Sequence, residues 1–190
     1  MNSTNKNSPL IPPPVINSEV MYKGVRLAVR KDYVDCGLKD PVLREVVEHP
    51  GAVVILPVFS DGQLLMVNQF RHPLGRMMFE FPAGTLEHGE KPDVCAHREL
   101  TEEAHFRAQS MISLGIIHPA PGFCNEQQFL FLATDLIPEK GTPDPGEIIE
   151  TAYFTVSEVK KMITNCMITD AKSIAIFSRA LFSGYFEQLQ

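Results

Sequence analysis

Basic residues are few in this sequence and are not clustered. The 190 residues include 17 Lys and Arg against 23 Asp and Glu, which gives a formal net charge of −6. A surface that binds nucleic acid needs clustered Lys and Arg to replace the counterions around the phosphates. We therefore expect no nucleic-acid partner, and an anionic substrate would need a metal ion or a few well-placed arginines.

Cysteine is also scarce, and its spacing excludes the common zinc motifs. The four cysteines form no CxxC pair and have no companion histidine at zinc-finger spacing; they are Cys36, Cys95, Cys124 and Cys166. Small apolar thiols of this kind are usually buried and free. We expect free, buried cysteines and a reducing, cytoplasmic location.

The sequence also shows no pattern typical of a leader peptide and no apolar run of membrane length. Its start, MNSTNKNSPLIPPP, has no basic segment followed by an apolar one, and no later apolar run approaches the length of a membrane span. We therefore expect no membrane partner. Because the polar, Pro-rich start can bury little apolar surface, residues 1–16 are predicted to be a flexible tail, and residues 17–190 a single globular domain.

Short apolar runs separated by turn residues predict a strand-rich chain with three helices. Strands are expected at 20–34, 42–51, 52–59, 63–70, 77–84, 111–118, 127–136 and 147–156. Helices are expected at 93–104, 157–165 and 170–186. Strands and helices mixed without a regular βαβ alternation indicate an α+β fold, or an α/β/α sandwich around a mixed sheet.

The helix expected at 93–104 concentrates negative charge. Glu99, Glu102 and Glu103 fall along one flank of it, at spacings that place like charges beside one another and destabilise the helix. A solvated acidic face is the ordinary interpretation of such a run. However, Arg98 is the one permanent cation nearby, and carbonyls of the preceding loop, 82–84, can face the same space. Oxygen ligands of this kind favour a hard divalent cation, Mg²⁺ or Mn²⁺.

The segment GTLEHGEKPDVCAHRELTEEAHF, residues 84–106, resembles the Nudix box. The matching positions are Gly84, Glu90, Arg98, Glu99, Leu100, Glu102, Glu103 and Phe106. His105 stands where the family has glycine, a position that often adopts the left-handed conformation, so we expect strain of about 1 kcal/mol there. The resemblance implies a Nudix fold with a mixed sheet, extra N-terminal antiparallel strands and a loop–helix–loop, and a metal held by Ala83, Glu99, Glu102 and Glu103.

The segments on either side of the box resemble the ADP-ribose and nucleoside-diphosphate-sugar pyrophosphatases. The matches are Gln69-Phe70-Arg71 and Glu80–Gly84 upstream, with Pro121, Gly122, Phe123 and Glu126 downstream; Ala120 replaces the usual serine. This implies hydrolysis of ADP-ribose to AMP and ribose 5-phosphate. Other nucleoside diphosphate sugars, such as GDP-mannose or a UDP- or ADP-hexose, stay open as substrates, and so does a non-catalytic nucleotide sensor.

The same resemblance assigns roles to individual residues. Catalytic residues would be Glu147 as the base, Glu150 as its competitor, and Glu103. Contacts to the substrate would come from Arg71, Arg76, Glu80, Phe123 and Glu126, while Arg98 and Glu90 would brace the loop against the helix. Strands within about 20–48 would exchange between subunits of a homodimer.

Overall fold

The protein is described by a computed structural model that covers residues 11–189. Residues 1–10, most of the expected tail, lie outside the described part. Contacts divide the chain into two compact units. The first comprises the chain up to His49 together with Gly122–Asn125, and the second comprises Pro50–Pro121 and the chain from Glu126 onward.

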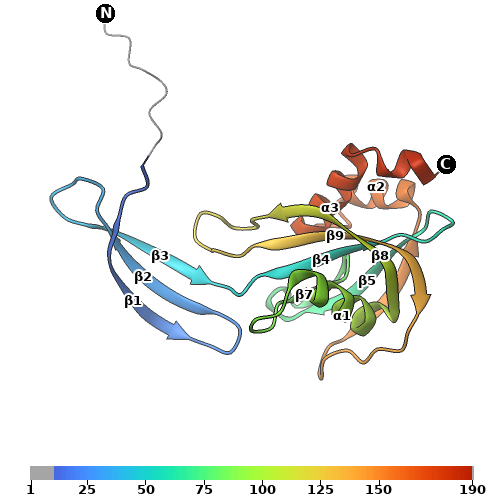
Figure 1. The fold of residues 1–190 in the computed structure, drawn as a ribbon, viewed down its shortest axis with the longest axis horizontal. Helices are drawn as coiled ribbons and strands as arrows, with labels where there is room; N and C mark the ends of the chain where they lie inside the picture. The colour runs from blue at the N-terminus through green and yellow to red at the C-terminus, as the bar shows by residue number, and fades with distance from the viewer. Residues whose placement is uncertain (1–10, 190) are drawn as a thin grey trace, which may run out of the picture. The chain divides into compact units, whose positions relative to one another are not determined.

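The first unit is a three-stranded antiparallel sheet. Its strands are β1 (Val15–Lys23), β2 (Ala28–Val34) and β3 (Val42–Glu48), in the order β1-β2-β3 (Figure 1). The run expected as one strand at 20–34 is a hairpin, turned where the Gly24 amide donates to the Leu27 carbonyl at 2.9 Å. The predicted tail limit is wrong by two residues, because Val15 already pairs with Val34.

The second unit contains two sheets. Its strands are β4 (Ala52–Pro57), β5 (Leu64–Arg71), β6 (Arg76–Glu80), β7 (Ala83–Thr85), β8 (Phe106–Ile117), β9 (Gln128–Pro138) and β10 (Ile149–Phe154). One sheet has the order β10-β5-β6, and the other is mixed, in the order β7-β4-β9-β8, with β4 and β9 parallel. The strand expected at 77–84 is divided into β6 and β7. The sequence did not predict β7 as a separate strand, because three residues are too few to show an alternating pattern.

All of the helices belong to this second unit. They are α1 (Pro92–Ala104), α2 (Val156–Thr164), α3 (Ala171–Phe182) and the short 3₁₀ helices η1 (His72–Leu74) and η2 (Tyr185–Leu189). The three predicted α-helices are confirmed. The third ends earlier than expected, and the chain passes through Gly184 at φ 70° into η2.

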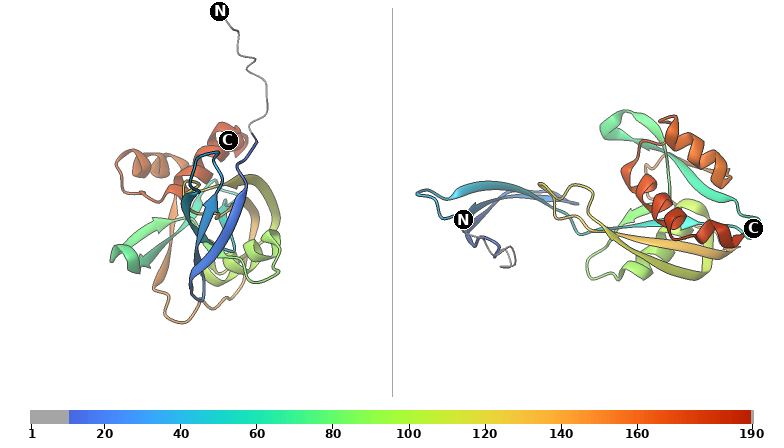
Figure 2. Two further views of the ribbon diagram at one scale, coloured as in Figure 1. Left: turned by 90° about the vertical axis from the view of Figure 1, so that its left-hand side faces the viewer. Right: turned by 90° about the horizontal axis from the view of Figure 1, so that it is seen from above.

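Strand β4 separates two apolar cores. Its six residues are all buried, and successive side chains point to opposite faces. Val54 and Leu56 pack in one core with α2 and α3, whereas Val53 and Ile55 pack in the other with α1 (Figures 1 and 2). Each fully buried aliphatic side chain contributes roughly 1.5–3 kcal/mol. The expected α/β/α sandwich is therefore confirmed.

The cysteine prediction is only partly right. All four cysteines are free, but only Cys95 is buried; Cys124 is half-buried, and Cys36 and Cys166 are exposed. Cys95 belongs to α1, and its side chain packs in the core on the buried side of that helix. Cys166 lies in the turn after α2 at φ 57°. Within residues 11–189 no helix has the length and apolar character needed to cross a membrane.

Candidate active site

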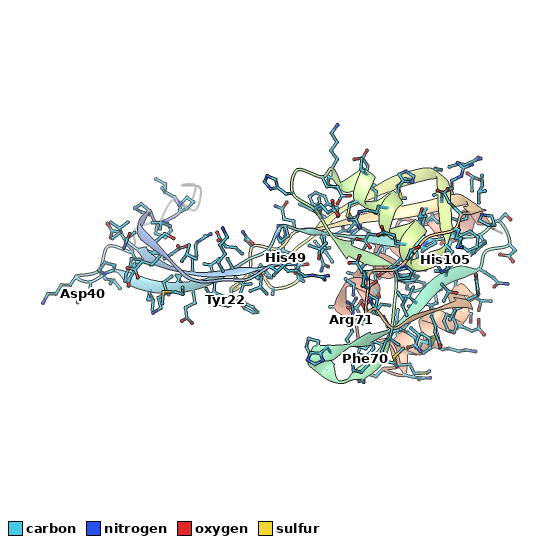
Figure 3. All side chains as sticks on the ribbon, turned by 90° about the horizontal axis from the view of Figure 1, so that it is seen from below. Tyr22, Asp40, His49, Phe70, Arg71 and His105 are labelled. Carbon is cyan, nitrogen blue, oxygen red and sulfur yellow. The ribbon has the colours of Figure 1, made fainter. Side chains whose placement is uncertain are left out.

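Helix α1 carries the three glutamates because its ends and its apolar stripe fix its rotation. Pro92 occupies the first turn, where its missing N–H is not needed, and Asp93 follows it near the positive end of the helix dipole. Cys95, Ala96, Leu100 and Ala104 are buried on one side. The helix ends at His105, which has φ 60° and ψ 35° and donates from its amide to Thr101 O at 3.1 Å. The predicted left-handed conformation of His105, which is labelled in Figure 3, is confirmed by these angles.

Gly84 is required because the carboxylate of Glu99 lies against it. A Cβ added at Gly84 would overlap the carboxyl carbon and both oxygens of Glu99. The side chain of Glu99 is therefore pressed onto strand β7, at the start of the loop that leads into α1. Only glycine leaves enough space for this approach.

Glu103 is the most deeply buried of the three carboxylates, with an exposed fraction of 4%. Its Oε2 accepts a hydrogen bond from the Ala83 amide at 3.0 Å. Burial raises the pKa of Glu103 to about 8, and the charges of Glu99 and Glu147 act in the same direction. Burial likewise raises the pKa of Glu99 to about 7. Both carboxylates thus hold protons unusually tightly, because burial outweighs the charges that lower their pKa values, those of Arg98 on Glu99 and of Arg71 on Glu103.

Arg98 of α1 links this helix to the segment that precedes it in the chain, between β7 and α1. Its Nε and Nη2 each lie 3.0 Å from an oxygen of Glu90, and its Nη1 lies 2.6 Å from Glu99 and 3.0 Å from Glu102. Nη2 also donates to the Thr85 carbonyl at 3.3 Å. The hydrogen bonds from Arg98 lower the pKa of Glu90 to about 2. Arg98 therefore neutralises more of the acidic helix than the sequence suggested.

Two of the three glutamates predicted to bind metal are buried next to each other on α1. Among residues 11–189, no three side chains of His, Cys, Asp or Glu form a ready-made metal cluster. Arg98 pairs with both Glu99 and Glu102. Glu102 is half-exposed, and its role as a metal ligand stays a prediction. Glu99 and Glu103 are buried beside the backbone of Ala83 and Gly84. Two buried carboxylates with raised pKa values next to a backbone strand are a suitable oxygen donor set for Mg²⁺ or Mn²⁺.

A third buried glutamate lies on β6. Glu80 is 1% exposed, and it accepts hydrogen bonds from Arg71 Nε at 2.8 Å and Nη2 at 2.6 Å. Lys172 of α3 pairs with the same carboxylate and with Asp170 at 3.0 Å. Both oxygens of Glu80 thus have partners within the protein, and its contact with substrate stays a prediction. Its carboxylate orients Arg71, which stands next to Phe70 at the end of β5 (Figure 3).

Lys172 is the residue that the sequence reasoning missed. It pairs with a glutamate 92 positions earlier in the chain, and no local pattern links two residues at that separation. The nearest signal is Asp170, whose side chain caps α3 by accepting from the Ser173 amide at 3.0 Å. That cap fixes the first turn of α3 and hence the direction of Lys172.

The two candidate bases occupy different positions. Glu147 is exposed just before β10, and it accepts a hydrogen bond from Gln69 Nε2 at 3.3 Å. Its charge also contributes to the raised pKa values of both Glu99 and Glu103. Glu150 lies within β10, where its backbone is opposite that of Asn68 in strand β5. The Oε1 atom of Gln69 is buried without a hydrogen-bond partner among the described residues, so it is available to accept a hydrogen bond.

The other predicted substrate contacts are dispersed. Arg76 is exposed and donates to Thr169 Oγ1 at 3.0 Å, and Glu126 accepts from Gln128 Nε2 at 2.9 Å. Phe123 is 60% exposed and belongs to the first unit. Their contacts with substrate stay predictions.

The family model of the NUDIX domain matches residues 48–174, which is more than half of the chain. The chain belongs to the Nudix family. An ADP-ribose pyrophosphatase of Bacillus subtilis is 40% identical over 132 residues, covering 68% of this chain and 71% of that protein. An ADP-ribose pyrophosphatase of Mycobacterium tuberculosis is 36% identical and covers 84% and 79%. A GDP-mannose pyrophosphatase of Yersinia enterocolitica is 31% identical and covers 79% and 83%.

A solved structure, titled as an ADP compounds hydrolase, has the same fold. Its TM-score is 0.81 at 19% identity, with 97% of this chain and all of that chain covered. At this identity the likeness concerns the fold alone. Together with the family match, it identifies this protein as a Nudix hydrolase.

Proposed function

We propose that this protein hydrolyses the pyrophosphate of ADP-ribose to AMP and ribose 5-phosphate, with Mg²⁺, or alternatively Mn²⁺, as its cofactor. One observation carries the proposal: Glu99 and Glu103 are buried side by side with raised pKa values, next to Ala83 and Gly84. Leaving two repelling carboxylates out of water is unfavourable unless a cation joins them. The ADP-ribose pyrophosphatases among its relatives support this choice of substrate.

The chemistry needs charge neutralisation before water can attack. A divalent cation bound here would offset the negative charge of the pyrophosphate and lower the pKa of water. Glu99, Glu103 and the carbonyl of Ala83 would hold it. Arg98 would keep Glu90 and the loop in place, so that the carboxylates stay aligned through the reaction.

Glu147 is the base that we propose. As water attacks phosphorus, the new P–O bond forms, the bond to the bridging oxygen breaks, and the proton of the water passes to the Glu147 carboxylate. General-base help of this kind contributes typically 10²- to 10⁴-fold. Gln69 would orient the carboxylate through its amide. Arg71, already aligned by Glu80, would hold a phosphate oxygen.

The test is a substrate panel of ADP-ribose, ADP-glucose, UDP-glucose and GDP-mannose, with phosphate detection after phosphatase treatment of the products. We expect the highest kcat/KM for ADP-ribose, with AMP and ribose 5-phosphate as products. A higher value for GDP-mannose, the substrate named for the Yersinia relative, or for another hexose would overturn the choice of sugar. Binding without turnover of any compound would favour a nucleotide sensor.

We also propose that the protein is a cytoplasmic homodimer whose β1-β2-β3 sheet meets a second copy. All nine residues of β1 are exposed, and the exposed side chains include Val15, Ile16, Val20, Met21 and Tyr22. An apolar strand of this kind is usually covered in the assembled protein. Light scattering after size exclusion should give twice the chain mass, and a concentration-independent monomer would contradict the proposal.

A further inference from the structure

The loop that carries Glu147 approaches the backbone of α1 closely at Gly141. This loop runs from Glu139 to Ile148, between β9 and β10, and contains no helix or strand. A Cβ added at Gly141 would overlap the carbonyl of Thr101 and would lie 2.8 Å from the Cα of Glu102. Both of these neighbours are backbone atoms of α1, which cannot rotate away as a side chain could.

Gly141 is needed for this close approach and not for an unusual backbone conformation. Its φ lies outside the left-handed region, in contrast with Gly146, which has φ 91° and open space around it. An alanine at 141 would therefore be strained only by the contact with α1. Helix α1 can move less than the loop, because its residues Leu100 and Ala104 are buried in the apolar core. The Thr101 carbonyl is also fixed by the hydrogen bond that it accepts from the His105 amide.

Three further hydrogen bonds hold the loop near its ends. At its start, the Glu139 amide donates to the His105 carbonyl at 2.9 Å. At its end, the Phe70 amide donates to the Ile148 carbonyl at 2.9 Å, and Gln69 donates to the Glu147 side chain at 3.3 Å. Between these ends, Gly141 is pressed against the helix that carries Glu99 and Glu103.

We propose that Gly141 is a positioning residue for catalysis: its contact with Thr101 and Glu102 latches the loop to α1 and sets the distance from Glu147 to the carboxylates of Glu99 and Glu103. The inference rests on the proposed function, in which Glu147 is the base. The loop thereby connects the base to the same helix that holds the metal ligands, so both halves of the site move together. A displacement of about 1 Å in such a site can lower the rate about 10²-fold.

The test is a double-mutant cycle of Gly141→Ala and Glu147→Gln, with Thr142→Ala as the matched control in the same loop. We expect Gly141→Ala to lower kcat about 10- to 100-fold with KM changed less than about twofold, and to add less than about twofold in the Glu147→Gln background. Thr142→Ala should match the wild type. An equal loss in both backgrounds, or no loss in either, would overturn the latch.

Hydrogen exchange provides a readout that does not depend on Glu147 being the base. In Gly141→Ala, amides 139–148 should exchange faster while those of α1 are unchanged; unchanged loop exchange would refute the latch. If Glu147→Gln keeps wild-type kcat, the base assignment fails, but the exchange result still decides the latch.

A second pair of variants covers the case in which Gly141→Ala does not fold. Glu139→Pro deletes the amide that donates to His105, whereas Glu139→Ala keeps it and loses the same ion pair with Arg107. We expect only the proline variant to speed loop exchange and lower kcat. Equal behaviour of the two variants would contradict the proposal.

Discussion

Glu80 and Glu103 are both almost fully buried in the same unit, yet their surroundings are opposite. Burial raises the pKa of Glu80, but its hydrogen bonds and charge interactions with Arg71 and Lys172 outweigh burial and bring the pKa below its usual value. Glu103 accepts one backbone hydrogen bond, from Ala83, and burial raises its pKa to about 8. The protein supplies its own cations to the glutamate that organises the structure. Glu103, at the proposed Mg²⁺ site, has no ion pair of this kind among the described residues.

The largest expected effect comes from removing that charge. Glu103→Gln should lower kcat about 10³-fold at saturating Mg²⁺, because one negative ligand is lost while the shape and the Ala83 hydrogen bond are kept. Steady-state kinetics measure it, and circular dichroism checks the fold. Asp93→Asn, at an exposed position on the same helix, should leave kcat unchanged. Wild-type kcat in Glu103→Gln would refute the metal assignment.

Substitution of the other buried glutamate, Glu80, by glutamine should lower the stability of the protein. Glu80→Gln leaves Arg71 and Lys172 facing a neutral group, so we expect the free energy of unfolding to fall by about 3 kcal/mol. Glu103→Gln should not lower it at pH 8 without metal, since it removes an unpaired buried charge. Urea unfolding of both variants measures the contrast. Equal losses would show that the two carboxylates are alike energetically.

The raised pKa values predict how stability depends on pH. Glu99 and Glu103 have folded pKa values of about 7 and about 8, above the usual value of 4.5. The folded state then holds protons that the unfolded chain releases, so stability of the metal-free protein should fall as pH rises from about 4.5 through 8. Glu90 has a lowered pKa of about 2. Its charge therefore stabilises the folded state at neutral pH, and this stabilisation is lost as the pH falls from about 4.5 toward 2.

This pH effect can be measured as the Tm in EDTA between pH 5 and pH 9. The decline should be shallower in Glu103→Gln, and saturating Mg²⁺ should raise the Tm more at pH 8 than at pH 6, since the cation replaces protons. A Tm shift from Mg²⁺ that is equal at both pH values would contradict the assignment of Glu99 and Glu103 as ligands.

The smallest effect concerns His105, beyond the end of the acidic helix. His105→Gly should stabilise the protein by about 1 kcal/mol, because glycine adopts φ 60° without strain. His105→Ala retains a Cβ and should not stabilise it. Urea unfolding compares the two, and kcat should change in neither. A destabilised glycine variant would show that the imidazole makes a compensating contact.

Much of the fold could be predicted from the sequence because its determinants are local. The alternation of apolar residues placed β4, β5 and β9, and the spacing of Leu100 and Ala104 placed α1. The left-handed turn at His105 could also be predicted, from its position after the helix. Very short elements and long-range contacts could not be predicted from the sequence. Strand β7 has only three residues, and the Lys172–Glu80 ion pair joins distant parts of the chain.

The sequence by itself determined the order of the elements, the acidic helix and its place in the Nudix family, since periodicity and motif spacing are properties of consecutive residues. Only the tertiary structure decided which glutamates are buried and which are paired. It turned Glu102 toward Arg98, enclosed Glu80 between Arg71 and Lys172, and left Glu103 beside Ala83. The physical reason is that the pKa of a carboxylate depends on the solvent and charges around it, and these come from residues far away in the chain.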